Sequence, residues 1–402
     1  MGESEMVRNQ RWTVMMAYGA VILVILSVYT MPSDGLGIGP FTASLDWNAS
    51  AVNSIAFLAI FAALYPSVWA CKAYGPVAVS IGGLLLVAAG CIGSIAGGSV
   101  IVLVSSVAAA LGLGVCSVAL PGLLMQTNPQ DCRSEVLGCT AAAAFTGYLC
   151  AAGLHYFCAV SLQQIEAVSG LLLLTVVVYL YHQCPVFARP HVVAAMLGKS
   201  LHQLRNTVLL SVICLLLLAG NCGCLICFTG FMVSLSDISQ DSAVLYLWLG
   251  LWGGILGSVG MGWILAKTVY RQCLLVSCTV FSFVFSILGF LLPTGAVPVL
   301  LFCIWFGIGG SITLLYSMVL AQVDLVYAGL ALLAGMQMLA YVLASIVAGL
   351  CVAGEHWLIA ALICTVTIVA ALILAMVLYE MAAGSALFIN LEEKKSIKNK
   401  LS

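Results

Sequence analysis

Charge is what this sequence has least of. Only 7% of its 402 residues are Asp, Glu, Lys or Arg, whereas 63% are apolar. Soluble domains carry about 25% charged and about 45–50% apolar residues, so a chain with a mean hydropathy of +1.19 cannot hide its apolar surface in a soluble core. The apolar runs reach about 20 residues without alternation, which predicts spanning helices and excludes a barrel of alternating strands. We expect an all-α integral membrane protein that contacts the lipid bilayer.

Signatures of catalysis, cofactor binding and nucleic-acid binding are also missing. No nucleophile stands beside a base, and no phosphate-binding glycine loop or zinc motif occurs. The 17 cysteines are spread over most of the apolar runs, and buried free cysteine behaves as a small hydrophobic residue. The segment NCGCLIC at 221–227 has no His, Asp or Glu in its span. We therefore expect no enzyme activity, no metal site, no cofactor and no nucleic-acid partner.

Twelve membrane-spanning helices are predicted from the apolar runs. They lie near 12–40, 49–70, 76–97, 99–125, 134–158, 165–183, 207–233, 242–265, 272–292, 295–320, 326–352 and 357–382. Residues 1–11 are polar and form a predicted N-terminal tail with no signal peptide, and 383–402 form a C-terminal tail.

The basic residues test this count independently. They are Arg8, Arg11, Lys72, Arg133, Arg189, Lys199, Arg205, Lys267, Arg271, Lys394, Lys395, Lys398 and Lys400. All of them fall at a terminus or in an even-numbered connection between predicted spans, and the odd-numbered connections contain none. Because Lys and Arg mark cytoplasmic loops, we expect a multi-pass protein with both termini in the cytoplasm. No address signal separates the plasma membrane from an organelle membrane.

The spans divide into two halves. Six helices cover 12–184, a cytosolic connector covers 185–206, and six more helices cover 207–382. Two six-helix halves around a central site are the plan of the major facilitator transporters, in which substrate binds near the middle of the membrane. Gly250 and Gly254, like Gly253 and Gly257, are four residues apart, a spacing that favours close helix packing.

Lys and Arg are absent from the deep part of the predicted spans. Multivalent anions are generally held by Arg clamps, so such substrates are disfavoured. The candidate substrate-binding residues are Tyr29, Asp34, Asn221 and Gln337. They suit a neutral or cationic solute, because an aromatic face attracts a quaternary ammonium group by about 0.5–2 kcal/mol.

Several segments resemble a branch of the major facilitator superfamily. Four segments are similar to the feline leukaemia virus subgroup C receptor-related transporters of choline and haem. They are RWTVMMAYGAVILVILSVYT, NSIAFLAIFAALYPSVWACKAYGPVAV, LGSVGMGWILAKTVYRQ and AGMQMLAYVLASIVAG. The second segment contains Pro66, Trp69 and Gly75. This resemblance implies that Tyr29 and Gln337 take the places of two choline-site residues.

The resemblance also has gaps. The aromatic residue of the seventh span has no counterpart near Leu216 or Ala219, and a glutamine of the fifth span is missing near Gly147. The acidic residues that help to latch the cytoplasmic gate in the superfamily are replaced by Lys72 and by Ala266.

The segment YTMPSDGLGIGP at 29–40 interrupts the first apolar run. Pro32 and the glycines would let the outer half of this span bend, since Pro removes a helix hydrogen bond. Asp34 would then face the outer vestibule, or it would only cap the span at the water interface, and both readings remain open. The predicted gating residues are Pro32, Lys72, Gly75 and Gly257.

The sequence thus predicts a monomeric facilitator that moves a small organic solute by rocking its two halves. A choline-like cation is the first substrate candidate, and haem or another amphipathic molecule is the second. The alternative from a different class is a transporter-shaped receptor or regulator that moves nothing.

Overall fold

The protein is a bundle of long helices. The computed structural model describes residues 49–96, 99–127, 133–158, 162–183, 201–235, 240–268, 270–291, 296–320, 326–352, 359 and 361–381. The first described helices are α2 (Ala49–Tyr74), α3 (Pro76–Gly93), α4 (Ser99–Thr127), α5 (Arg133–Cys158) and α6 (Leu162–Gln183), with a short 3₁₀ turn, η2, at Ser94–Ala96. They are followed by α7 (Leu201–Leu235), α8 (Gln240–Lys267), α9 (Arg271–Leu291), α10 (Val297–Leu320), α11 (Val326–Val352) and a last helix at Ala361–Met381.

Every span predicted from 49–70 onward has a helix, and the span predicted at 12–40 lies outside the described residues. Within the described part, eight helices are long and apolar enough to cross a membrane. α2 and α6 contribute shorter apolar stretches, at Leu58–Tyr74 and Ala167–His182. α7 begins at Leu201, inside the connector predicted at 185–206, because its polar first turn continues the helix beyond the apolar stretch that starts at Arg205.

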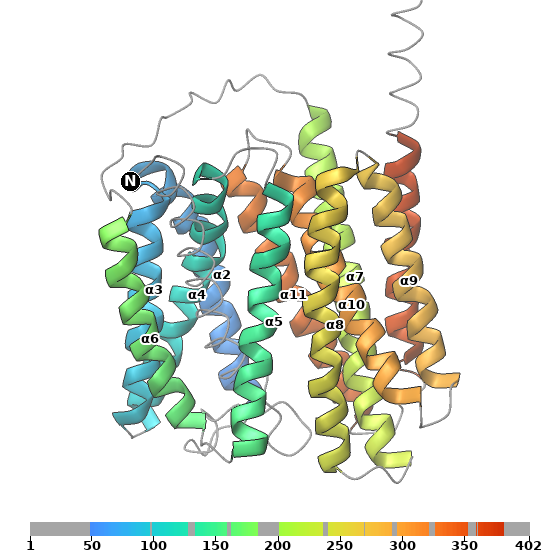
Figure 1. The fold of residues 1–402 in the computed structure, drawn as a ribbon, viewed down its shortest axis with the longest axis horizontal. Coiled ribbons are helices and arrows are strands. Elements are labelled where there is room, and N and C mark those ends of the chain that lie inside the picture. Colours follow the sequence, from blue (N-terminus) through green and yellow to red (C-terminus); the bar gives the residue numbers. More distant parts are fainter. Residues whose placement is uncertain are drawn as a thin grey trace, which may run out of the picture.

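The two halves lie side by side. In Figure 1 the helices of the first half, coloured blue to green, occupy one side, and the yellow to red helices of the second half occupy the other. The halves meet along two seams, where α5 packs against α8 and α10, and where α2 and α4 pack against α11. One apolar core cluster includes buried side chains from both halves, among them Phe145 and Leu149 of α5 and Leu251 of α8.

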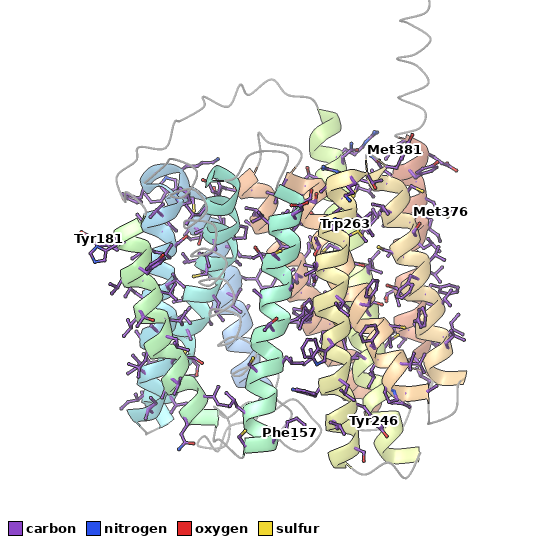
Figure 2. The ribbon with its side chains drawn as sticks, viewed as in Figure 1. Phe157, Tyr181, Tyr246, Trp263, Met376 and Met381 are labelled. Carbon is purple, nitrogen blue, oxygen red and sulfur yellow. The ribbon has the colours of Figure 1, made fainter. Side chains whose placement is uncertain are left out.

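The Lys and Arg residues of the described helices lie near the helix ends that Figure 1 draws at the top. This end, called the basic end below, carries Lys72, Arg133, Arg205, Lys267 and Arg271 near helix termini. Trp263 lies near it in Figure 2, whereas Phe157 and Tyr246 lie near the opposite end. Lys267 Nζ sits 3.8 Å from the centroid of the exposed Trp263 ring. An amphipathic aromatic ring beside a cation is typical of a membrane–water interface.

The corner between α2 and α3 requires glycine. Gly75 has φ 85° and ψ 153°, a conformation that side chains disfavour but that glycine adopts readily. Its N–H donates to the Cys71 carbonyl at 3.1 Å, and Pro76 occupies the first helical position of α3, where its missing N–H costs nothing. This sharp reversal keeps Lys72, which is exposed, at the basic end.

Candidate functional site

Polar side chains inside the bundle mostly bond to their own helix. Ser106 donates to the Val102 carbonyl, and Thr140 donates to the Val136 carbonyl, each at 2.7 Å. Such bonds satisfy a hydroxyl without joining two helices. The polar contacts that do cross between helices are therefore the informative ones, and one group of them joins α10 to α11.

Gln337 is the centre of this group. The Tyr316 hydroxyl on α10 donates to Gln337 Oε1 at 3.3 Å, and Gln337 Nε2 donates to the Tyr341 hydroxyl oxygen at 3.1 Å. Tyr316 is 7% exposed, and Gln337 and Tyr341 are half-buried. An amide buried without partners would cost several kcal/mol, so the two tyrosines hold Gln337 in place. We call these three residues the Gln337 cluster.

The cluster contains no formal charge. The charged residues of the described helices all lie near helix ends; they are Lys72, Arg133, Glu135, Glu166, Arg205, Asp241, Lys267, Arg271 and Glu380. Amide and phenol groups in an apolar setting offer hydrogen-bond donors, acceptors and aromatic faces. Such a group can recognise a neutral or cationic solute, whereas it offers no cation to pair with a multivalent anion.

Asn221 lies elsewhere. It is 2% exposed, and its Nδ2 donates to the Ser282 hydroxyl at 3.1 Å, which joins α7 to α9. The neighbouring Gly220 and Gly223 face Cys364 and Ile368 of the last helix. The structure therefore brings Asn221 into a contact between α7 and α9.

The other predicted site residues have separate locations. Tyr29, Pro32 and Asp34 lie outside the described residues. Gly257 is packed on α8 against the backbone of α10, where an added Cβ would run into the Phe306 carbonyl. This contact is the close packing that the four-residue glycine spacing predicted.

Sequence reasoning missed the aromatic contacts of the seam between α5 and its partners. Phe145 meets Trp305 edge to face, with ring centroids 5.7 Å apart. Farther from the basic end, Trp248 Nε1 donates to the Leu149 carbonyl at 3.0 Å, and its ring contacts Phe157 at 5.4 Å. The glycine stripe of α8 was the available signal, because Gly250 and Gly254 are where Trp305 and Phe145 fit.

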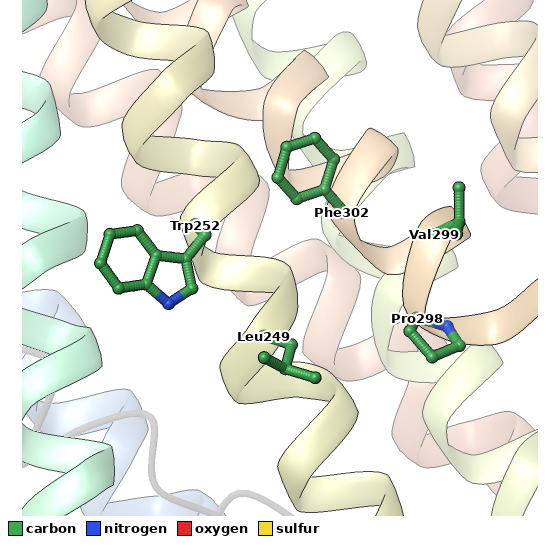
Figure 3. Close-up of a pocket in the computed structure, with 5 residues that line it drawn as sticks. All are labelled: Leu249, Trp252, Pro298, Val299 and Phe302. Atoms are coloured by element: carbon green, nitrogen blue, oxygen red, sulfur yellow. The ribbon is translucent and has the colours of Figure 1, made fainter.

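A shallow groove of about 370 Å³ lies on the outer surface of the second half (Figure 3). Its lining consists of Leu249, Trp252, Pro298, Val299 and Phe302. All five side chains are apolar except for the indole N–H, and Val299 is 64% exposed. A surface of this kind suits lipid tails better than a polar solute, which needs several converging polar groups to orient it.

The cysteines near NCGCLIC are packing residues. Cys224 is buried with Leu217, Cys364 and Ile368 in one apolar cluster. Within the described ranges, no three His, Cys, Asp or Glu side chains are grouped so that they could hold a metal ion.

Comparisons with known proteins establish the fold. The chain matches no protein-family model and no curated protein. It is similar to the crystal structure of the major facilitator transporter FucP in the outward conformation, with 14% identity, a TM-score of 0.69, and coverage of 91% of this chain and 97% of that one. It is also similar to the xylose symporter XylE, with 14% identity, a TM-score of 0.70, and coverage of 92% of this chain and 95% of that one. The human organic anion transporter MFSD10 has 12% identity and a TM-score of 0.72, with coverage of 93% of this chain and 99% of that one. The chain therefore has the major facilitator fold, and none of these findings supports the receptor-related branch.

The bond between Asn221 and Ser282 is testable by a double-mutant cycle. Asn221→Ala and Ser282→Ala should each lower the free energy of unfolding by about 0.5–1.5 kcal/mol, the range of hydrogen bonds between membrane helices. The double variant should lose little more than one single variant, because the two residues share one interaction. Denaturant titration in detergent micelles measures these values.

Ser277→Ala is the matched control on α9, since this exposed hydroxyl donates to the Cys273 carbonyl of its own helix. Fully additive losses would show that the two side chains do not depend on each other. If Asn221→Ala left the stability unchanged but abolished solute binding, Asn221 would be a substrate-binding residue.

Proposed function

We propose that this chain, which has the major facilitator fold, is a secondary transporter of a small neutral or cationic organic solute. The observation that carries the proposal is the uncharged Gln337 cluster, which lies between two helices of the second half while the described charges stay near helix ends. Transport proceeds by alternating access, in which the two halves rock about a central site. The chain is a carrier and not an enzyme, and we expect it to work as a monomer.

Two features of the site guide the choice of solute. The rings of Tyr316 and Tyr341 can face a quaternary ammonium group, which makes a choline-like cation the first candidate. Their hydroxyls and the Gln337 amide can equally hold an uncharged polar solute. FucP and XylE are described as fucose and xylose symporters, and these sugars are uncharged. Haem or another amphipathic molecule is the second candidate.

Facilitated diffusion is the expected mode of transport. Proton-coupled carriers use ionisable residues within the membrane, and the described helices carry their acidic residues near helix ends. Asp34 is the acidic residue proposed either to face the outer vestibule or to cap the first predicted span. In the proposed topology, this multi-pass membrane protein has both termini in the cytoplasm.

The orientation follows from the basic end. Because Lys and Arg stay on the cytoplasmic side, the connection between α8 and α9 should be cytosolic and the connection between α9 and α10 should be external. A short segment with an Asn-x-Ser acceptor, inserted between residues 294 and 295, should acquire a glycan. The same segment inserted after Thr268 should not. A glycosidase-sensitive mobility shift in the second insertion alone would reverse the proposed orientation.

Uptake tests the transport proposal directly. Cells that express the chain should take up labelled choline with saturation. Gln337→Ala should lower uptake at low choline concentration about tenfold, because an unpaired polar group at a buried site costs about 1–3 kcal/mol. Tyr29→Ala should have an effect in the same direction. The matched control is Gln164→Ala, which makes the same change at an exposed position of α6. Surface expression is equalised among the variants.

Competition against choline uptake tests whether the protein recognises the positive charge of the solute. The uncharged isostere 3,3-dimethyl-1-butanol should compete poorly if the aromatic faces bind the ammonium group, and as well as choline if only hydroxyl recognition operates. Absence of choline uptake by folded protein would reject the choline assignment, and a solute screen on the purified protein would follow. A solute that binds and depends on Gln337 but is never transported would favour the receptor alternative.

A further inference from the structure

The two halves are joined at the basic end by a pair of hydroxyl groups. Ser134 near the start of α5 and Ser317 near the end of α10 have their Oγ atoms 3.2 Å apart, and the two residues are 6% and 4% exposed. Nη1 of Arg271, the first residue of α9, donates to the Ser317 carbonyl at 3.4 Å. This carbonyl is among the last four of α10, which lack a partner within the helix. Arg271 thus holds the end of α10 in the position where Ser317 meets the other half.

Two glycines bring the backbones together beside this hydroxyl pair. A Cβ on Gly138 of α5 would lie 2.6 Å from the Ser258 carbonyl oxygen and 2.9 Å from Gly262 Cα on α8. A Cβ on Gly262 would lie 2.9 Å from the Ser134 carbonyl oxygen. Backbone atoms cannot turn aside as a side chain can, so a side chain at either position separates the halves here. We call Ser134, Ser317, Gly138 and Gly262 the basic-end gate.

The gate is connected to the Gln337 cluster through α10. Tyr316 and Ser317 are consecutive residues, and consecutive side chains on a helix point about 100° apart. Tyr316 therefore reaches α11 and Gln337, while Ser317 reaches α5 and Ser134. The last turns of α10 cannot shift toward one contact without changing the other.

We propose that the end of α10 couples solute binding to the gate. The inference rests on the proposed function, since the cluster is taken as the solute site. With the hydroxyl pair bonded and the glycines in contact, the basic end is closed. Solute that engages Tyr316 and Gln337 shifts the last turns of α10, breaks the bond between Ser134 and Ser317, and frees α5 to part from α8.

The chemistry of the gate suits reversible opening. The bond is between two uncharged hydroxyls, and Glu135, the neighbouring carboxylate on α5, is exposed. A neutral hydrogen bond shifts an equilibrium about two- to tenfold. Solute binding can supply a bias of this size, whereas a buried ion pair would be harder to break. The resemblance places Lys72 and Ala266 where the superfamily has acidic residues that help to latch the cytoplasmic gate. Their replacement is consistent with a latch that works without charge.

Hydrogen–deuterium exchange of the full chain in lipid nanodiscs, without solute, tests the gate. The first N–H groups of α5 lack partners within the helix, so their exchange reports water entry at the basic end. Ser134→Ala should raise exchange at the start of α5 about two- to tenfold, and Gly262→Ala should raise it at least as much. Gly260→Ala is the matched control two residues away on α8, because no atom of another described helix lies within 4 Å of its added Cβ. Equal exchange in Gly262→Ala and Gly260→Ala would overturn the gate.

A second pair of variants tests the coupling. Tyr316→Phe removes the hydroxyl that donates to Gln337 and leaves the four residues of the gate unchanged, yet it should also raise exchange at the start of α5. Tyr341→Phe leaves the bond between Tyr316 and Gln337 intact and should exchange as the parent does. Parental exchange in Tyr316→Phe would overturn the coupling. If no solute is transported but both differences are found, the proposed function fails while the gate stands. Size-exclusion profiles confirm that each variant is folded.

Discussion

Hydrocarbon offers no hydrogen-bond partner, and the architecture of this protein depends on that constraint. Every backbone N–H and C=O in the membrane must be satisfied within the protein, so the described apolar segments are helices. The same constraint governs the side chains. Ser and Thr hydroxyls return to carbonyls of their own helix, as in Ser106 and Thr140, and the few groups that bond between helices fix how the helices meet. Among the described helices, few polar side chains bond to another helix, and each such contact is therefore informative.

Close packing then decides where the halves touch. Lipid tails are as apolar as the helices, so association between helices depends on fitted surfaces and not on the exclusion of water. On α8, two rows of glycines on different faces serve two neighbours. Gly253 and Gly257 receive the backbone of α10, while Gly254 and Gly262 receive Phe145 and the backbone of α5. A helix with such a surface can bind its own half firmly and still meet the other half along a seam that opens.

The candidate site and the proposed gate both use α10. Tyr316 belongs to the Gln337 cluster and Ser317 to the basic-end gate. Neither contact involves a buried charge. In the proposed mechanism, the carrier would bind its solute by hydrogen bonds and aromatic faces and change state by exchanging weak contacts. These features agree with a facilitator of neutral or cationic solutes.

The sequence by itself determined the membrane-spanning class, the helix positions from 49 onward and the segregation of basic residues, since these depend on local composition and helix length. It also pointed to the major facilitator plan and to Gln337 as a polar residue within an apolar span. The narrower family resemblance rested on short apolar patches, which many membrane helices share, and the comparisons did not support it. Only the tertiary structure decided that Asn221 bonds to Ser282, that Tyr316 and Tyr341 hold Gln337, and that Ser134 meets Ser317. The physical reason is that a helix's period tells which residues share a face, whereas the partner of that face is set by how segments far apart in the chain pack together.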